Sequence, residues 1–316
     1  MLQYIIRRLL WSVVMLLLIS MIVFVIFFVL AGGGREVAVR MSGKNPSPRN
    51  IENTIERLGL DQPIYVQFGK YVWNALQGDL GRDYHNGLPV TSQVLSHLPA
   101  TASLAIGASI VWLMIGIPIG VISALKRRSL MDRGAMLFAL MGVSLPTFWL
   151  GLMVVFLFDF RLNWYVVGEY ERLTVDPVLW FRALWLPWLV LAVTQAAFYT
   201  RMVRGNMLEV QGEDYIRTAR AKALRERSVI RHALRSALTP VVTMYGLDVG
   251  ILMGGAIITE AIFNIPGIGT LTVSAINAAN FPVIMGTTLV ASFAVIAANL
   301  LVDIVYASLD PRVTYS

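Results

Sequence analysis

Long runs of apolar residues alternate with polar segments, and six of these runs are long enough to cross a lipid bilayer. A spanning helix needs about 20 apolar residues. The predicted spans cover residues 9–31, 101–125, 135–158, 183–199, 241–262 and 282–302. The first run is 23 residues long, whereas the apolar part of a secretory signal has about 7–15 residues. We therefore interpret the first run as a retained span.

The charges between the spans predict which side of the membrane each segment faces. Residues 126–133 carry four Lys and Arg against one acid, and residues 201–240 carry nine against four. Residues 159–182 carry three Arg against four acids. Because cytoplasmic loops collect Lys and Arg, the first two segments are predicted inside and the third outside. Six spans then place both termini in the cytoplasm, in agreement with Arg7-Arg8 and Arg312.

The polar segment 32–98 is predicted to be a small folded unit outside the membrane. Asn50 precedes a short helical run over residues 51–58, and Gly59 follows as a helix stop. Pro63 then stands at a predicted first helical position, and the run that it starts ends at Gly78. The expected organisation is an N-terminal segment with the first transmembrane helix (1–31), an extracytoplasmic segment (32–98) and a transmembrane core (99–316).

The overall composition agrees with this pattern. The chain is 57% hydrophobic and 14% charged, and its mean hydropathy is +0.67. Soluble domains are about 25% charged, so a soluble or a disordered protein is excluded and an all-α polytopic membrane protein is predicted. No cysteine is present, and the three histidines lack the spacing of a helical metal pair, so no metal site is expected. The net charge of +7 suits an anionic membrane surface, and we expect no nucleic-acid partner.

The basic segment 213–240 differs from an ordinary loop. It is rich in the strong helix formers Ala, Leu, Arg and Lys. Tyr215, Ala219 and Lys222 fall on one predicted helix face, and Ile216 and Ala223 lie beside it. Small alanines allow the backbone of another protein to approach closely. The alternative is a cationic helix that lies on anionic lipid headgroups, and physical reasoning from the residues leaves both interpretations open.

The order of residues in this segment resembles a known family. Residues 214–224 read DYIRTARAKAL, residues 231–235 read RHALR and residues 238–240 read LTP. This order is similar to the coupling loop of the permeases of ATP-binding-cassette (ABC) importers. The resemblance is closest to the dipeptide, oligopeptide and nickel permeases.

Motifs elsewhere in the chain resemble the first (B-type) permease of the same family. They are residues 59–63 (GLDQP), 78–81 (GDLG), 144–149 (SLPTFW), 259–269 (TEAIFNIPGIG) and 310–312 (DPR). One position departs from the family pattern, because Ala223 stands where the family has Gly. Since Ala adopts a positive φ less readily than Gly, the turn there is expected to be wound more tightly or to be helical.

The resemblance implies a type I importer permease with six transmembrane helices and a coupling loop at residues 204–240. It implies that a short helix docks on a cytoplasmic ATPase through Asp214, Tyr215, Arg217, Thr218, Ala219, Ala221, Lys222, Ala223 and Leu224. The implied partners are a second homologous permease (as a heterodimer), two cytoplasmic ATPase subunits, an extracytoplasmic substrate-binding protein and the lipid bilayer. Peptides are the commonest cargo that the resemblance implies, and nickel, glutathione and oligosaccharides remain open. The chain has no phosphate-binding loop, so it is expected to bind no cofactor and to do no catalysis itself, while its ATPase partners use ATP and Mg.

Two acids within the fifth predicted span are candidates for the substrate pathway, because ionisable groups inside a membrane are costly. These acids are Asp248 and Glu260. For Asp248 the alternative is a buried acid that bonds a neighbouring helix, and for Glu260 it is solvation at the interface. In an ion- or proton-coupled secondary transporter, the other functional class considered, both acids would be carriers. Such transporters often contain inverted repeats, and none is found in the sequence.

Overall fold

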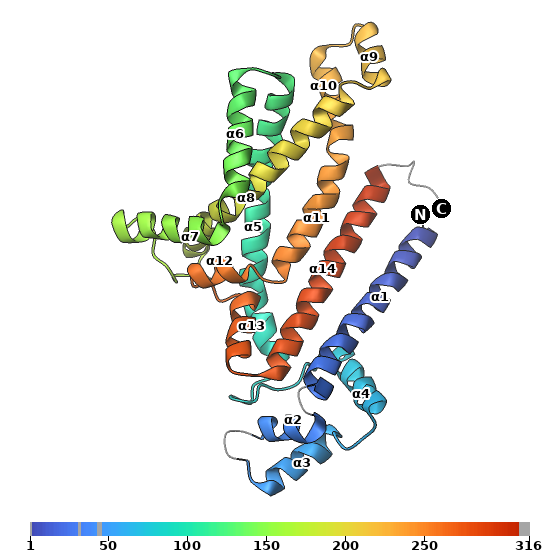
Figure 1. Cartoon of the computed structure of the whole chain (residues 1–316), viewed down its shortest axis with the longest axis vertical. Helices are drawn as coiled ribbons and strands as arrows, with labels where there is room; N and C mark the ends of the chain where they lie inside the picture. Colours follow the sequence, from blue (N-terminus) through green and yellow to red (C-terminus); the bar gives the residue numbers. More distant parts are fainter. Residues whose placement is uncertain (1, 31–32, 43–45, 310–316) are drawn as a thin grey trace. The chain divides into compact units, whose positions relative to one another are not determined.

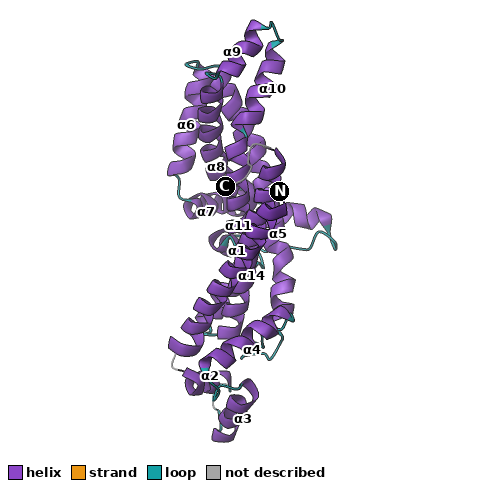
Figure 2. Ribbon diagram, turned by 90° about the vertical axis from the view of Figure 1, so that its right-hand side faces the viewer, coloured by secondary structure: helices purple, strands orange, loops and turns teal. Residues whose placement is uncertain are grey.

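The structure, a computed structural model, describes residues 2–30, 33–42 and 46–309, and these residues are helical apart from loops and one isolated β-bridge between Arg82 and Pro89 (Figure 2). The motif at residues 310–312 lies outside the described residues. Within the described part the prediction of an all-α fold is confirmed.

The α-helices are α1 (Leu2–Phe24), α2 (Gly33–Met41), α3 (Pro48–Leu58), α4 (Ile64–Leu76), α5 (Val90–Leu125), α6 (Leu130–Ser144), α7 (Thr147–Val155), α8 (Pro177–Val210), α9 (Asp214–Ala221), α10 (Glu226–Ala237), α11 (Thr239–Met253), α12 (Ile257–Ile262), α13 (Ile268–Asn277) and α14 (Phe281–Leu309); π-helical turns cover Val25–Leu30 and Phe156–Arg161.

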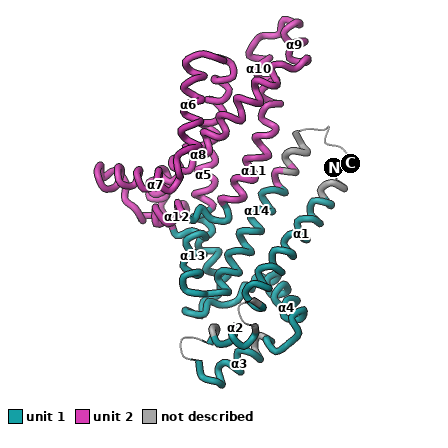
Figure 3. The backbone as a smooth tube through the Cα atoms, viewed as in Figure 1, with its two compact units in different colours: residues 1–101, 253–257, 266–300 teal, residues 102–252, 258–265, 301–316 magenta. Residues whose placement is uncertain are grey.

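The chain divides into two compact units (Figure 3). Unit 1 contains residues 1–101, 253–257 and 266–300, and unit 2 contains residues 102–252, 258–265 and 301–316.

Among residues 2–30, 33–42 and 46–309, four helical segments are long and apolar enough to cross a membrane: Ile6–Val29, Val90–Leu125, Pro177–Val210 and Phe281–Val302. Two further pairs of helices pass the same criteria but are bent, α6 with α7 and its π-turn, and α10 with α11. The described part of the chain therefore has four candidate spans, or up to six if each bent pair is one span.

The third predicted span, residues 135–158, is not one straight helix. The two helical parts on either side of Leu145 and Pro146 are inclined by 94°. Leu145 is extended, with φ −81° and ψ 123°, because the ring of a proline disfavours helical geometry at the residue before it. The prediction of one straight helix over residues 135–158 is therefore wrong, because the segment contains two helices that meet at a sharp bend. The mean hydropathy of a segment does not show such a change of direction.

The fifth predicted span, residues 241–262, is also interrupted. α11 ends at Met253 and α12 begins at Ile257. Gly255 has φ +113°, a conformation that favours glycine, and a Cβ there would lie 2.8 Å from the Cα of Gly269. The break therefore depends on a residue without a side chain.

The fourth predicted span, residues 183–199, is too short. α8 covers Pro177–Val210, and its first turn is capped by the Asp176 carboxylate, which accepts hydrogen bonds from the backbone N–H groups of Val178 and Leu179. The prediction stopped before Arg201 because charged residues were assigned to the loop. Because a helix continues through its backbone hydrogen bonds and does not need an apolar sequence, α8 extends past Arg201 to Val210.

The predicted helices of the segment after α1 are present in unit 1, with one different cap. α3 starts at Pro48, and its N-cap is Ser47, whose hydroxyl accepts from the N–H of Asn50; Asn50 itself is inside the helix. Gly59 ends α3 with φ +64°, and α4 begins directly after Pro63. α2 was not predicted. Its buried residues Val37 and Ala38 pack with Leu60, so these helices share a small core.

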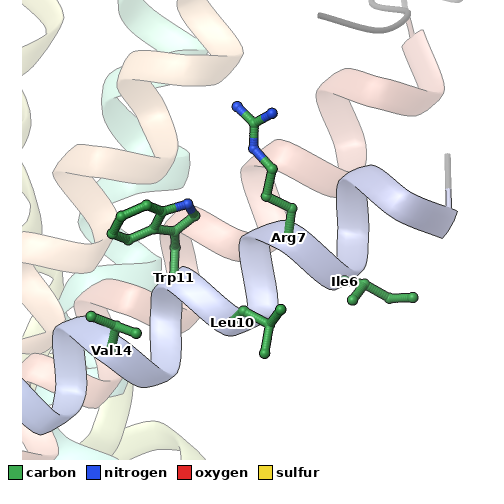
Figure 4. A pocket seen from close by; sticks show the side chains of 5 residues that line it. All are labelled: Ile6, Arg7, Leu10, Trp11 and Val14. Carbon is green, nitrogen blue, oxygen red and sulfur yellow. The ribbon is translucent and has the colours of Figure 1, made fainter.

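One face of α1 remains uncovered. Ile6, Leu10, Trp11 and Val14 are all exposed and, with Arg7, line a hollow of about 410 Å³ on the helix surface (Figure 4). A water-soluble protein rarely exposes such a continuous apolar surface. This face fits a helix that contacts lipid or another membrane protein.

Candidate functional site: the coupling segment and the helices that hold it

The predicted coupling segment folds in unit 2 as two short helices, α9 and α10, joined by a turn at residues 222–225 (Figure 1). We call residues 214–237 the α9–α10 hairpin. Ile216 of α9 is fully buried, as are Val229, Ala233 and Ala237 on one face of α10. The Tyr215 hydroxyl donates to Ser236 Oγ at 3.0 Å. The hairpin is therefore a folded helical element with buried apolar side chains, and not an extended loop.

Most of the residues predicted to dock on the ATPase are on the surface of the hairpin. Asp214, Tyr215, Arg217, Thr218, Ala221, Lys222, Ala223 and Leu224 are exposed. Ala219 is half-buried, because it lies one turn after Ile216 on the side that faces the rest of the hairpin. Of the alanines on α9, Ala221 is thus the more accessible to a partner.

Charged pairs define the polar surface of the hairpin. Arg217 lies 3.3 Å from Asp214 Oδ1, and Arg220 Nη2 donates to Glu226 Oε1 at 3.1 Å. Both pairs are exposed, so each contributes little to stability in water. They keep the hairpin polar and unsuited to the bilayer core.

The turn after α9 has the geometry that a glycine would favour. Ala223 has φ +55°, in the left-handed region, and its N–H donates to the carbonyl of Arg220. α9 ends at Ala221, so the expectation that this position could be helical is wrong. The chain adopts the turn despite the Cβ of Ala223, whose left-handed conformation is unfavourable.

Ala223→Gly is therefore expected to stabilise the protein. Relief of the left-handed strain is worth about 1–2 kcal/mol, and the greater unfolded-chain entropy of glycine offsets about 0.5–1 kcal/mol of this. A rise in the thermal midpoint of the detergent-purified chain tests the expectation. Ala219→Gly is the matched control, because it places glycine inside α9 and is expected to lower stability by about 1 kcal/mol. Equal shifts of the same sign in the two variants would contradict the interpretation of the turn.

α8 leads directly into the hairpin and is tied to it. Asn206 of α8 donates from Nδ2 to the carbonyl of Ala237, the last residue of α10, at 3.0 Å. Only a short turn separates the end of α8 from α9. A force applied to the hairpin therefore reaches α8 through the chain and through this contact.

A buried ion pair connects the same stretch of α8 to the start of α6. The Asp132 carboxylate accepts from Arg204 Nε at 2.6 Å and from Arg204 Nη2 at 3.0 Å. It also accepts from Ser123 Oγ at 2.6 Å and from the N–H of Arg128 at 2.9 Å. Asp132 is only 5% exposed, so both of its oxygens are satisfied within the protein. We call Asp132, Arg204, Ser123 and the Arg128 N–H the brace.

Sequence reasoning did not identify the brace. Asp132 and Arg204 are 72 residues apart, and each was counted only as a loop charge. α6 and α8 also pack closely (Figure 1), since a Cβ on Gly142 would lie 2.5 Å from the Cβ of Ala197. This contact supports close packing through small residues as the role of Gly142.

Asp248 is on α11 and has a partner. The Tyr199 hydroxyl of α8 donates to Asp248 Oδ2 at 2.7 Å. Nearby, Ser109 Oγ and the Tyr245 hydroxyl are 3.1 Å apart, and the fully buried Trp112 packs against both tyrosine rings. Asp248 thus belongs to a polar cluster that links α5, α8 and α11.

Glu260 is on α12, on the other side of the α11–α12 break, and is fully buried. Its backbone carbonyl accepts from the N–H of Ile265 at 2.8 Å. The expectation that interfacial water solvates Glu260 is not met in this structure, where the side chain is enclosed by protein.

Several transport proteins are similar to this chain over most or all of its length. A putative peptide transport system permease protein of Brucella abortus is 43% identical over 281 residues, which cover 89% of this chain and 90% of that protein. The oligopeptide transport system permease protein AppB of Bacillus subtilis is 40% identical, with full coverage of both chains. The dipeptide transport system permease protein DppB of Escherichia coli is 37% identical and covers 100% of this chain and 99% of its own.

Two family profiles also match. Residues 1–105 match the N-terminal membrane component of binding-protein-dependent transport systems. Residues 116–315, which include α6 to α14, the brace and the α9–α10 hairpin, match the inner membrane component of the same systems. The chain therefore belongs to the family of inner membrane components of binding-protein-dependent transport systems, the permease subunits of ABC importers.

Proposed function

We propose that this chain forms half of the pathway through which an ABC importer takes up peptides, di- or oligopeptides, delivered by a substrate-binding protein. The observation that carries the proposal is the full-length similarity to an oligopeptide and a dipeptide permease. The exposed α9–α10 hairpin at the end of α8 supplies the means of coupling. Family membership supports this function and not an ion- or proton-coupled secondary transporter.

In the proposed assembly this chain has three kinds of protein partner besides lipid. A second, homologous permease completes the pathway as a heterodimer, two cytoplasmic ATPase subunits bind the coupling hairpins, and the binding protein docks on the outer side. This chain binds no cofactor in the proposal, and ATP with Mg is used by the ATPase subunits. The apolar, exposed face of α1 suits a contact with lipid or with the second permease.

The proposed topology has six spans: the bent pair of α6 and α7 counts as the third, and the fifth begins with α11 and not with α10, which belongs to the coupling hairpin. Residues 1–31 contain the first span, residues 32–98 form the extracytoplasmic segment with α2, α3 and α4, and residues 99–316 form the core. Both termini are cytoplasmic, as the excess of Lys and Arg around Arg7-Arg8 and in residues 201–240 indicates. The multi-pass inner-membrane location agrees with the family.

The proposed docking surface consists of Asp214, Tyr215, Arg217, Thr218, Ala219, Ala221, Lys222, Ala223 and Leu224. Its exposed members are available to the ATPase, and the half-buried Ala219 supports the surface from within the hairpin. When the ATPase subunits close on ATP, the hairpin moves, and the Asn206 contact and the brace pass that movement to α8 and α6. The spans then change from inward-facing to outward-facing.

Asp248 and Glu260 are proposed to act on the substrate pathway. Asp248→Asn is expected to lower peptide uptake by about tenfold, equivalent to roughly 1.4 kcal/mol, without lowering the amount of protein in the membrane. The Asn side-chain oxygen can still accept from the Tyr199 hydroxyl, so the contact that supports folding is retained while the charge is lost. Uptake and membrane abundance are measured on the same cells.

Tyr199→Phe is the companion variant, because it removes the donor and keeps the Asp248 carboxylate. It is expected to affect abundance more than the uptake by each inserted transporter. An equal fall of uptake and abundance in Asp248→Asn would assign Asp248 a structural role alone.

Reconstitution tests the proposed function itself. Liposomes that contain this chain, the second permease and the ATPase subunits are loaded with ATP, and labelled di- and tetrapeptides are added outside with the binding protein. Uptake is expected to require ATP and the binding protein and to be unaffected by a protonophore. Uptake that follows a proton gradient without ATP would contradict the importer mechanism, and ATP-dependent uptake of other solutes alone would contradict the peptide cargo.

A further inference from the structure

Unit 1 contains a cavity of about 670 Å³ that the transport mechanism above does not use. It lies where the candidate spans Ile6–Val29 and Phe281–Val302 have their ends, next to α4 and the turn at residues 79–87. Its principal lining side chains are Phe24, Phe28, Lys70, Tyr71, Arg82 and Met285.

The apolar part of the lining comes from the spans. Phe24 and Phe28 stack with ring centroids 4.7 Å apart, and the Tyr71 ring lies 5.8 Å from Phe24. Pro282 and Met285 of the first turn of α14 also line the cavity. The side of the cavity that belongs to the membrane helices is therefore suited to hydrocarbon.

The charged part comes from elements outside the spans. Lys70 of α4 is exposed and forms no ion pair with another described residue. Arg82 is exposed and uses Nη1 to donate to the carbonyl of Gly87. The lining also contains two acids: Asp79 is exposed and its Oδ1 accepts from the N–H of Gly81, whereas Asp83 is buried. An anion in the cavity would therefore meet two accessible cations, Lys70 and Arg82, and one exposed carboxylate, that of Asp79.

The wall that carries Arg82 is fixed by a buried carboxylate. Asp83, 7% exposed, accepts hydrogen bonds from Asn280 Nδ2 at 2.6 Å, from Gln93 Nε2 at 3.0 Å and from the N–H of His85 at 2.8 Å. Burial raises the pKa of Asp83, but these bonds outweigh it and hold the pKa below the ordinary value. Asp83 is thus satisfied as an anion, and it holds the turn against α5 and the start of α14.

We propose that this cavity binds the headgroup of an anionic phospholipid, with Lys70 and Arg82 neutralising the phosphate and with Phe24, Phe28 and Met285 contacting the glycerol and the first methylenes. The two halves of the lining match the two halves of such a molecule. The cavity lies at the ends of membrane spans, where phospholipid is the most concentrated amphiphile. A Lys or Arg near a membrane surface attracts anionic headgroups by roughly 1 kcal/mol.

Native mass spectrometry of the full-length chain, released from mild detergent with dioleoyl phosphatidylglycerol, tests the proposal. Loss of Lys70 and Arg82 together, as Lys70→Gln with Arg82→Gln, is expected to lower lipid retention by about 25-fold, at about fivefold for each charge. Asn74→Trp leaves the charges in place and fills the cavity from α4, and the same loss is expected. Arg49→Gln is the matched control, because Arg49 is an exposed cation of α3 in the same unit that does not line the cavity. Membrane abundance and gel-filtration profile exclude misfolding.

The competing ligands give distinct outcomes. Retention of phosphatidylglycerol over phosphatidylcholine, with no displacement by inorganic phosphate or by a dipeptide, supports the proposal. Equal loss in Arg49→Gln, equal retention of phosphatidylcholine, or no retained lipid overturns it. Displacement by a dipeptide would make the cavity a cargo site, and displacement by inorganic phosphate alone would make it an anion site; each result likewise overturns it. The measurement involves no transport, so its outcome is independent of the proposed function.

Discussion

Ala221→Glu is expected to leave the chain in the membrane at normal abundance and to abolish its co-purification with the ATPase subunits. Ala221 is exposed at the end of α9, so a longer side chain there disturbs no contact within the permease. In the proposed complex the same position is covered by the ATPase, and the carboxylate would be buried without a partner. Such burial costs several kcal/mol, which at 1.4 kcal/mol per tenfold weakens association by about a hundredfold or more.

His232→Glu is the matched control. His232 is exposed on α10 of the same hairpin, and the substitution adds the same charge away from the proposed contact. If the hairpin only rests on anionic lipid, both variants change membrane attachment slightly and to the same extent, since a charge near the surface is worth about 1 kcal/mol. Undiminished ATPase recovery with Ala221→Glu would show that the docking surface is elsewhere. Ala219 is a weaker probe, because its side chain is half-buried within the hairpin.

The second large effect is expected at the brace. Asp132→Asn removes the charge that faces Arg204, whose side chain is 22% exposed. The NH₂ group of the asparagine cannot accept the hydrogen bonds that Arg204, Ser123 and the Arg128 N–H donate to the carboxylate. Removal of one partner from a buried ion pair costs about 3 kcal/mol. The detergent-purified variant is therefore expected to unfold at a clearly lower temperature, and ATP-driven uptake is expected to fall further than its abundance.

Two comparisons separate the brace from a general effect of the substitution. Asp214→Asn makes the same change in another Asp–Arg pair, but that pair is on the surface, so thermal stability is expected to change little. The double variant Asp132→Asn with Arg204→Gln removes both charges and is expected to be less damaging than the sum of the single changes. Strict additivity of the two single effects would mean that the ion pair does not exist in the folded protein.

The sequence predicted the apolar segments well and their interruptions poorly. The first span was located within a few residues, because no charged residue interrupts residues 9–31. The 94° bend at Leu145 and Pro146 and the break before Ile257 were missed. Mean hydropathy measures whether a segment prefers lipid, whereas one proline or one glycine with positive φ decides its direction, and the average does not register a single residue.

At the candidate site, the sequence predicted the structure formed by neighbouring residues but not the contacts between residues far apart in the chain. The α9–α10 hairpin could be predicted from helix formers and from the resemblance, because the residues that define it are close in the sequence. Ala223 has the positive φ that the glycine of the family pattern would favour, although the methyl side chain of alanine makes this conformation unfavourable. The Asp132–Arg204 and Tyr199–Asp248 contacts join residues far apart in the chain, and no spacing rule in a single sequence predicts such pairs.

The length of α8 sets how far a small motion can be transmitted. Its 34 residues make a rod about 51 Å long at 1.5 Å per residue, and the hydrocarbon core is about 30 Å thick. In the proposed orientation about 20 Å of the rod stands clear of the hydrocarbon and holds the hairpin at its tip. If α8 pivots at its end near the outer membrane surface, a tilt of about 6° moves the end that carries the hairpin by about 5 Å. Conversely, a nucleotide-driven displacement of that size at the hairpin is sufficient to reorient the whole helix.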